Sequence, residues 1–140
     1  MPGECHLITA GRPDQLCEIS EFVVQAARRA GLNEKDVFYV QTAVDEACAN
    51  IIEHAYEGQE GGHIRLNCCW TEDTFTVTIQ DRGSPFDPEA VPPPNLSDNL
   101  DARGVGGLGL YFMRQMMDEV CFEFDDQAGN TLTMVKRIKP

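Results

Sequence analysis

Apolar residues recur at helical spacing over residues 33–56 and predict the longest helix of the chain. Five of them follow each other at steps of three or four: Val37, Val40, Val44, Ala47 and Ile51. Side chains at this spacing lie on one side of a helix, so we expect them to face the core. Asn33 is a preferred N-cap residue, and Glu34 and Asp36 in the first turn favour the positive end of the helix dipole. The central helix is therefore predicted to begin at Asn33.

A second row on the same helix is polar and repeats every four residues. It consists of Thr42, Glu46, Asn50 and His54. Residues at this spacing share one side of the helix, about a third of a turn from the apolar stripe. Such a row lines the wall of a pocket or forms the solvated edge of an amphipathic helix, and the spacing alone leaves both interpretations open.

Two further helices are predicted, one before and one after the central helix. Pro13 suits the first turn of a helix, apolar residues follow at a helical period, and Arg28, Arg29 and Gly31 mark the end. The other helix is predicted over residues 110–120. The side chains expected to face the core from it are Leu110, Met113, Met117 and Val120.

Five segments carry strand patterns. They are residues 4–9, 63–71, 74–80, 121–125 and 130–138. In the third segment Phe75, Val77 and Ile79 alternate with threonines, which predicts one buried face and one more polar face. Only Glu72 and Asp73 separate the second segment from the third, so we expect these two to form an antiparallel hairpin.

Residues 84–103 show little periodicity and contain prolines at positions 92, 93 and 94. A connection of about 20 residues without obvious secondary structure is uncommon in a compact domain and usually has a function or moves. We interpret this segment as a lid.

Composition and charge limit the class of protein. The chain has 140 residues, of which 42% are hydrophobic. This is enough for one well-packed domain over residues 1–140 and too little for two. The formal net charge of -12 argues against nucleic acid or an anionic membrane surface as the main partner. No apolar run approaches the roughly 18 residues of a membrane span and no signal pattern opens the chain, so we expect a cytosolic protein.

Six cysteines could suggest a disulfide framework or a metal site. They are Cys5, Cys17, Cys48, Cys68, Cys69 and Cys121. The chain has no C-x-x-C pair, several of the six fall in predicted helices or strands, and a cytosolic protein keeps its thiols reduced. We therefore expect free thiols that lie mostly in the core.

Two glycine-containing segments are candidates for ligand binding. Residues 104–109 open a predicted helix, whose N-terminal amides favour an anion such as phosphate, although a flexible loop has a similar composition. They match neither a Rossmann fingerprint nor a P-loop. Asp81 and Gly83 follow a strand; the carboxylate there can accept a hydrogen bond from an amine such as that of adenine, and the glycine admits a ring. A plain turn has the same sequence.

The polar row of the central helix is a third candidate for ligand binding. In this row Glu46 and Asn50 could share a hard cation and its phosphates.

Taken together, three ordered motifs resemble the ATP-binding boxes of the GHKL ATPases. The first is DEACAN at 45–50 with EHAY at 53–56, and the second is DRGSPFD at 81–87. The third is GGLGL at 106–110, followed by MMDEV at 116–120. Within these ATPases the pattern is most similar to the RsbW-type anti-sigma factor serine/threonine kinases. The resemblance covers nearly the whole chain and is weakest in the first dozen residues and in the lid.

The resemblance implies an α+β fold, the two-layer α/β sandwich called the Bergerat or GHKL fold, with a mixed, mainly antiparallel sheet and helices on one face. ATP would lie between the central helix and a lid at about 84–106. By this match Glu46 would be the catalytic base, Asn50 would bind Mg²⁺, and Asp81 would bind the adenine amine. The other nucleotide contacts implied are His54, Gly83, Phe86, Gly106, Gly107, Leu108, Gly109 and Thr131. His54 also admits a purely structural role.

One departure from the wider superfamily is Pro85, which stands where the second glycine of an Asp-x-Gly-x-Gly box is usual. The RsbW-like branch tolerates this change. Gly104 and Val105 ahead of the last glycine box are a further difference, and the offset of Arg103 does not match a phosphate-binding residue.

The resemblance implies an ATP-dependent protein kinase, a homodimer, that sequesters a sigma factor and phosphorylates a STAS-type anti-anti-sigma protein. The alternative is a non-catalytic or weakly catalytic ATP-binding module of a signalling pathway, including a detached sensor-kinase ATPase domain. Glu46 favours the kinase. A sensor kinase would need a phospho-accepting histidine on an upstream dimerisation helix, but His6 lies too early and His54 falls inside the nucleotide motif.

Overall fold

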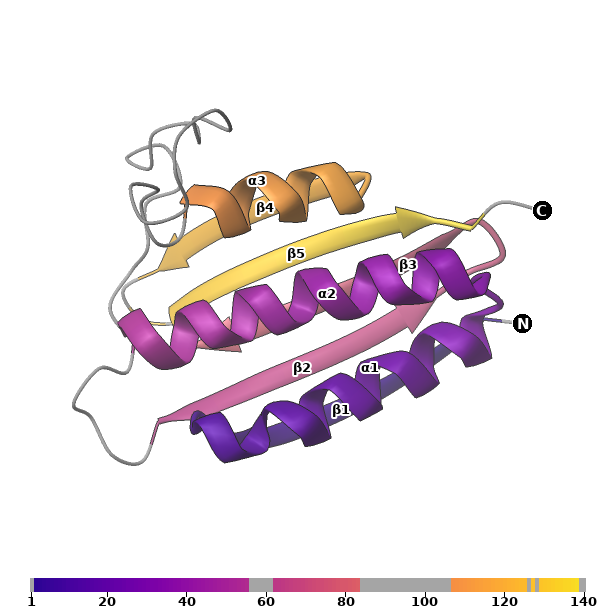
Figure 1. Cartoon of the computed structure of the whole chain (residues 1–140). Coiled ribbons are helices and arrows are strands. Elements are labelled where there is room, and N and C mark those ends of the chain that lie inside the picture. Colours follow the sequence, from indigo (N-terminus) through magenta and orange to yellow (C-terminus); the bar gives the residue numbers. More distant parts are fainter. Residues whose placement is uncertain (1, 56–61, 84–106, 126, 128, 139–140) are drawn as a thin grey trace.

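The computed structural model describes residues 2–55, 62–83, 107–125, 127 and 129–138, and of residues 54, 55 and 107–109 it describes only the backbone (Figure 1). Within these ranges the elements follow each other as β1 (Gly3–Ala10), η1 (Pro13–Gln15), α1 (Leu16–Ala30), α2 (Glu34–Asn50), η2 (Ile51–Ala55), β2 (His63–Trp70), β3 (Thr74–Asp81), α3 (Gly107–Met116), β4 (Glu119–Asp125) and β5 (Gly129–Arg137). The predicted lid at 84–106 lies outside the described residues.

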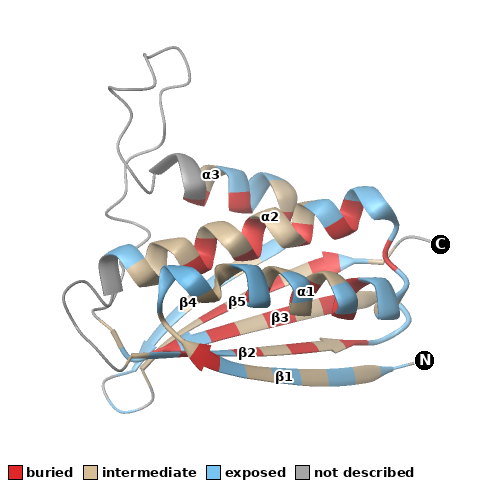
Figure 2. Cartoon of the chain, turned by 60° about the horizontal axis from the view of Figure 1, so that its bottom comes forward, coloured by how far each residue is buried: buried red, intermediate tan, exposed pale blue. Residues whose placement is uncertain are grey.

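The strands form one sheet in the order β1-β2-β3-β5-β4, and the α-helices cover one of its faces (Figures 1 and 2). The predicted two-layer α+β fold is confirmed. All four strand pairings in the described part of the chain are antiparallel, so the sheet is more uniform than the mixed one that we expected. The predicted hairpin of β2 and β3 is present.

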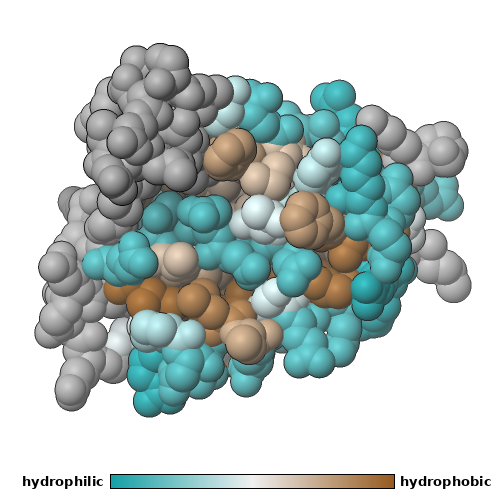
Figure 3. Space-filling model, in the orientation of Figure 1, coloured by the Kyte–Doolittle hydropathy of each residue, from teal (hydrophilic) through white to brown (hydrophobic). Residues whose placement is uncertain are grey.

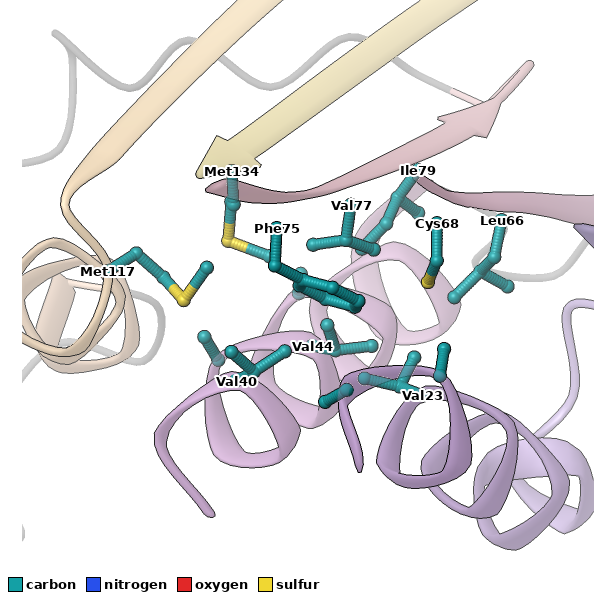
Figure 4. Close-up of a cluster of buried hydrophobic side chains, with 14 of the residues drawn as sticks. Val23, Val40, Val44, Leu66, Cys68, Phe75, Val77, Ile79, Met117 and Met134 are labelled. Atoms are coloured by element: carbon teal, nitrogen blue, oxygen red, sulfur yellow. The ribbon is translucent and has the colours of Figure 1, made fainter. Parts of the chain in front are cut away.

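The core lies between the helices and the sheet. Phe75, Val77 and Ile79 of β3 point toward the helices, where they meet Val40 and Val44 of α2 (Figure 4). Figure 2 shows the same arrangement as buried positions on the facing sides of both layers. Fully burying such side chains contributes about 1.5–3 kcal/mol each. The alternation predicted for this strand is confirmed.

The central helix begins where the sequence predicts. The side chain of Asn33 accepts a hydrogen bond of 2.8 Å from the backbone N–H of Asp36, which satisfies one of the free N–H groups of the first turn. At its other end the helix continues as the π-helix η2 (Ile51–Ala55). The preceding helix α1 ends at Ala30, and its C-cap Gly31 has a left-handed backbone with φ of 97°.

The last helix differs from its prediction. The structure has α3 from Gly107 to Met116, not from 110 to 120, and Val120 lies in β4 opposite Met134. The chain leaves the helix early because the backbone N–H of Asp118 donates to the carbonyl of Val135 in the sheet. Val120 still packs against the core, although from a strand.

A buried lysine joins three elements at the end of the sheet where β5 finishes. The Nζ of Lys136 donates to the carbonyl oxygen of Met116 at 2.6 Å and lies 3.9 Å from Oδ1 of Asp36. It also lies 5.1 Å from the centre of the Tyr39 ring. Lys136 thus compensates a carbonyl at the C-terminus of α3 and a carboxylate in the first turn of α2.

The cysteine prediction is partly wrong. All six thiols are free, but only Cys48 and Cys68 are buried, while Cys17 and Cys121 are exposed. These last two occupy the outer side of α1 and the uncovered face of the edge strand β4. The helix-bearing side of the molecule is largely hydrophilic, with hydrophobic groups in separate places (Figure 3). None of the described helices is long and apolar enough to cross a membrane.

Candidate functional site

The polar row of α2 leads to the end of the molecule where β3 finishes and β5 and α3 begin (Figure 1). Glu46 and Asn50 lie one turn apart and are both half-buried, as is Thr42 one turn earlier. The Oγ1 of Thr42 donates to the carbonyl oxygen of Phe38 at 2.8 Å and so serves the helix itself. His54 falls in η2, and its side chain lies outside the described residues.

Asp45 and Glu46 are adjacent in sequence but have different surroundings. Asp45 contacts Ser20 of α1, and the same Ser20 hydroxyl accepts a hydrogen bond of 2.7 Å from Gln41. Burial raises the pKa of Asp45, the hydrogen bond with Ser20 opposes this, and the neighbouring charge of Glu46 adds to the rise. Asp45 therefore belongs to the contact between α1 and α2, and Glu46 remains the carboxylate of the polar row.

Asp81 closes β3 and faces the helix layer, two residues beyond the buried Ile79. Its Oδ1 accepts two hydrogen bonds, one of 2.9 Å from the backbone N–H of Gly83 and one of 2.8 Å from Nδ2 of Asn130. The carboxylate is buried, which raises its pKa, while the hydrogen bonds from Asn130 and Gly83 oppose the rise. Burial raises the pKa of the Cys48 thiol on α2, and the charges of Asp45 and Asp81 add to the rise.

Gly129 allows β5 to pass close to Asp81. Its φ is 91°, a backbone conformation that favours glycine, and an added Cβ would collide with the carbonyl oxygen of Asp81. The residue that follows, Asn130, pairs with Asp81 in the sheet and turns its amide toward the carboxylate. A glycine before Asn130 is thus what brings the two side chains together.

The structure does not bring Thr131 to Asp81. Thr131 pairs with Gln80, so its side chain lies on the uncovered face of the sheet, whereas Asp81 and Asn130 lie on the helix-bearing face. Side chains alternate along a strand, and an assignment shifted by one residue therefore moves to the opposite face. Asn130 was not among the residues predicted for the site. The signal in the sequence that could have found it is Gly129 at the start of the last strand, because a glycine there indicates that another backbone approaches closely.

A cavity of about 300 Å³ opens beside this network. Among the described residues it is lined by Arg82, Gly83, Phe124, Asp125, Gln127, Gly129 and Asn130. Phe124 lies opposite Asn130 in the sheet and is 43% exposed. An aromatic ring beside hydrogen-bonding groups is a surface suited to a flat heterocycle.

The glycine cluster lies only partly within the described residues. α3 begins at Gly107, so Gly107, Leu108 and Gly109 form its first turn, where backbone N–H groups have no partner within the helix. Such a turn can receive an anion. Gly106 and Phe86, two other predicted nucleotide contacts, lie outside the described residues.

A magnesium ion that is held mainly by a nucleotide needs few ligands from the protein. No group of three or more His, Cys, Asp or Glu side chains in the described ranges could hold a metal by itself. Mg²⁺ usually takes one or two protein oxygens and completes its shell with phosphate oxygens and waters. The amide oxygen of a half-buried Asn50, one turn from Glu46, is a donor of this kind.

Comparison with known proteins agrees with this geometry. Residues 9–136 match the family model of the histidine kinase-like ATPase domain. The chain is 34% identical over 116 residues to the serine-protein kinase RsbW of Bacillus pumilus (strain SAFR-032), covering 79% of this chain and 70% of that protein. It is 32% identical over 116 residues to RsbW of Listeria monocytogenes serovar 1/2a, with 80% and 73% covered.

Two solved structures share the fold. The RsbU and RsbW domains of a Mycobacterium tuberculosis protein align with a TM-score of 0.66 at 14% identity, over 99% of this chain and 33% of that one. The histidine kinase domain of a blue-light activated histidine kinase from Erythrobacter litoralis aligns with a TM-score of 0.54 at 16% identity, over 89% and 60%.

Proposed function

The chain belongs to the family of histidine kinase-like ATPase domains, with RsbW serine-protein kinases among its relatives, and we propose that it is an ATP-dependent serine/threonine protein kinase that acts as an anti-sigma factor. One observation carries the proposal: the match over residues 9–136 includes every element of the site, from the polar row on α2 to the network of Asp81 and Asn130.

Adenine is placed at the end of β3 in this proposal. Asp81 accepts a hydrogen bond from the adenine amine, Gly83 leaves room for the ring, and Phe124 offers an apolar wall next to it. The phosphates then extend toward the first turn of α3 at Gly107, Leu108 and Gly109. In this proposal Asn130 is a further polar residue of the site, while Thr131, which pairs with Gln80, lies on the other face of the sheet.

Asn50 and Glu46 divide the chemistry between them. Asn50 would supply an amide oxygen to Mg²⁺, which when bound balances the charge of the phosphates. Glu46 would take the proton from the attacking serine or threonine hydroxyl. Phosphoryl transfer depends largely on positioning and electrostatics, so the rigid α2, capped at Asn33 and packed on the core, is a suitable support for both residues.

The relatives suggest the partners. We propose that the kinase binds a sigma factor, phosphorylates a STAS-type anti-anti-sigma protein, and so takes part in the regulation of transcription as a cytoplasmic homodimer. The support is the similarity to RsbW kinases over about four-fifths of the chain. A high negative net charge of -12 is compatible with protein partners and disfavours direct binding to DNA.

The test is a phosphorylation assay with the purified chain. Labelled ATP, Mg²⁺ and candidate anti-anti-sigma proteins encoded by the same organism are incubated with the kinase, and phosphoproteins are separated on a gel. We expect one candidate to be labelled on a serine or threonine, and only when Mg²⁺ is present. Nucleotide binding without labelling of any candidate would favour a non-catalytic ATP-binding module.

A further inference from the structure

We propose that Asn130 sets the base specificity of the nucleotide site, as a positioning residue that holds the Asp81 carboxylate in the orientation that recognises an amine. This inference rests on the proposed nucleotide site and adds a residue that the family motifs quoted above do not include. The observation behind it is a closed network of three residues at the junction of β3 and β5.

Asn130 uses both hydrogens of its amide nitrogen in this network. Nδ2 donates to Oδ1 of Asp81 at 2.8 Å and to the carbonyl oxygen of Gly83 at 3.0 Å. Both partner atoms can only accept, which fixes the orientation of the amide: a flipped side chain would place its oxygen against two other oxygens. The same Oδ1 of Asp81 also accepts the backbone N–H of Gly83.

The network assigns different tasks to the two oxygens of Asp81. Oδ1 is committed to Asn130 and Gly83, which leaves Oδ2 to meet a ligand. An ionised carboxylate accepts hydrogen bonds and donates none. It therefore pairs with the amino group at C6 of adenine, and it repels the carbonyl oxygen that hypoxanthine and guanine carry at the same position.

Because the Asp81 carboxylate is buried, its charge depends on the hydrogen bonds from Asn130 and Gly83. Asp81 is 7% exposed, and placing a carboxylate there raises its pKa, while the hydrogen bonds from Asn130 and Gly83 lower it. Without the amide of Asn130, the carboxylate would lose one of its two donors and could rotate about its side-chain bonds. Recognition of the amine would weaken, because selectivity depends on where Oδ2 is held.

The test compares two nucleotides that differ only at C6 of the base. Dissociation constants of ADP and inosine diphosphate, each with Mg²⁺, are measured by titration calorimetry on the wild-type chain and on Asn130→Ala. We expect the preference for ADP, expressed as the ratio of the two constants, to fall about tenfold in Asn130→Ala, the size of one hydrogen bond to a charged group. Affinity for inosine diphosphate should change by less than about threefold.

Thr131→Ala is the matched control, because Thr131 is the next residue of β5 and lies on the other face of the sheet. Its ratio should equal that of the wild type. Asn130→Thr keeps one donor group, so it should retain an intermediate preference, and it serves in place of Asn130→Ala if that variant does not fold.

Every result of this comparison either supports or overturns the role of Asn130. Equal losses of affinity for both nucleotides, or an unchanged ratio in Asn130→Ala, would overturn the assignment of Asn130 while leaving the nucleotide site intact. A wild-type chain that binds neither nucleotide would instead overturn the proposed function, and this inference with it.

Discussion

The two ends of β5 each hold a buried carboxylate, and their partners differ. Asp36 and Asp81 are both 7% exposed. Near the end of β5, Asp36 lies 3.9 Å from the ammonium group of Lys136. At the start of the same strand, Asp81 is bound by the amide of Asn130 and the N–H of Gly83. Six residues of strand, about 20 Å, separate the two.

The difference indicates which carboxylate is structural and which is available to a ligand. A cation beside Asp36 compensates its charge inside the protein, and the same cation holds the end of α3 through the carbonyl of Met116. Asp81 has neutral donors on one oxygen, so its charge is stabilised without being paired in that network. A buried carboxylate of this second kind is suited to recognise a donor group on a ligand.

The largest expected effect is on stability, at the end of β5 where Lys136 lies beside Asp36. Lys136→Met leaves Asp36 as a buried charge without its cation and removes the donor to Met116, which should lower the free energy of unfolding by about 3–5 kcal/mol. Urea unfolding measures this directly. ADP binding should persist in the variant at temperatures where it is folded.

Lys35→Met is the control for this variant. Lys35 also lies near the Tyr39 ring, 5.6 Å from its centre, but it is exposed. Its replacement should change stability by about 0.5 kcal/mol or less. Equal effects of the two substitutions would show that Lys136 does not compensate a buried charge.

The second largest effect is expected at Asn50 and Glu46, at the end of the sheet where the nucleotide is proposed to bind. Asn50→Ala should weaken nucleotide binding and abolish phosphorylation together, because the amide oxygen is needed by Mg²⁺. Glu46→Gln should leave nucleotide affinity within a few-fold and slow phosphoryl transfer by about 100-fold, the low end of what a lost general base costs. Binding is followed by calorimetry and transfer by single-turnover labelling.

Thr42→Ala is the control for both variants. Thr42 belongs to the same row, but its hydroxyl donates a hydrogen bond to the carbonyl oxygen of Phe38 within the helix. This variant should behave like the wild type. If Glu46→Gln phosphorylates at the wild-type rate, Glu46 is not the base, and the row serves only to hold metal and water.

The smallest expected effect is on the pH dependence of stability without nucleotide. Burial raises the pKa of Asp81 above its unfolded value, so its contribution to stability is present at low pH and is lost as pH rises through the folded-state pKa. Asp81→Asn removes this titration. The difference in unfolding free energy, variant minus wild type, should therefore increase between pH 4 and pH 7.

Urea unfolding at a series of pH values between these limits gives the difference. The titration of Asp45, which burial also raises, is common to both proteins and cancels. A difference that stays flat, or that decreases with pH, would mean that burial does not disfavour the charge of Asp81.

Periodicity predicted most of the fold because each element depends on residues close in sequence. The cap at Asn33, the stop at Gly31 and the alternation of Phe75, Val77 and Ile79 are local features, and the structure confirms them. The end of α3 was not predictable in this way. Val120 fits a helical period as well as a strand, and only its pairing with Met134 decides between them.

The site was predictable in outline but not at each residue. The polar row and Asp81 stand out from their spacing and position, and the end of α2 at Asn50 lies at the same end of the molecule as the end of β3 at Asp81 (Figure 1). Thr131 was assigned by resemblance, and a shift of one residue along a strand exchanges it for Asn130. Lys136 lies within a predicted strand, and nothing near it in sequence reveals that Asp36 and Met116 will surround it.

The most direct measurement is the rise in Tm caused by ADP and Mg²⁺ in three proteins: the wild type, Lys136→Met and Asp81→Asn. Nucleotide at about a hundred times its dissociation constant should stabilise the wild type by about 2.7 kcal/mol. Lys136→Met should melt at a lower temperature and still show the rise, whereas Asp81→Asn should lose most of it at the same nucleotide concentration. No rise in the wild type, or an equal rise in Asp81→Asn, would contradict the assignment of a nucleotide site to the Asp81 end of the sheet.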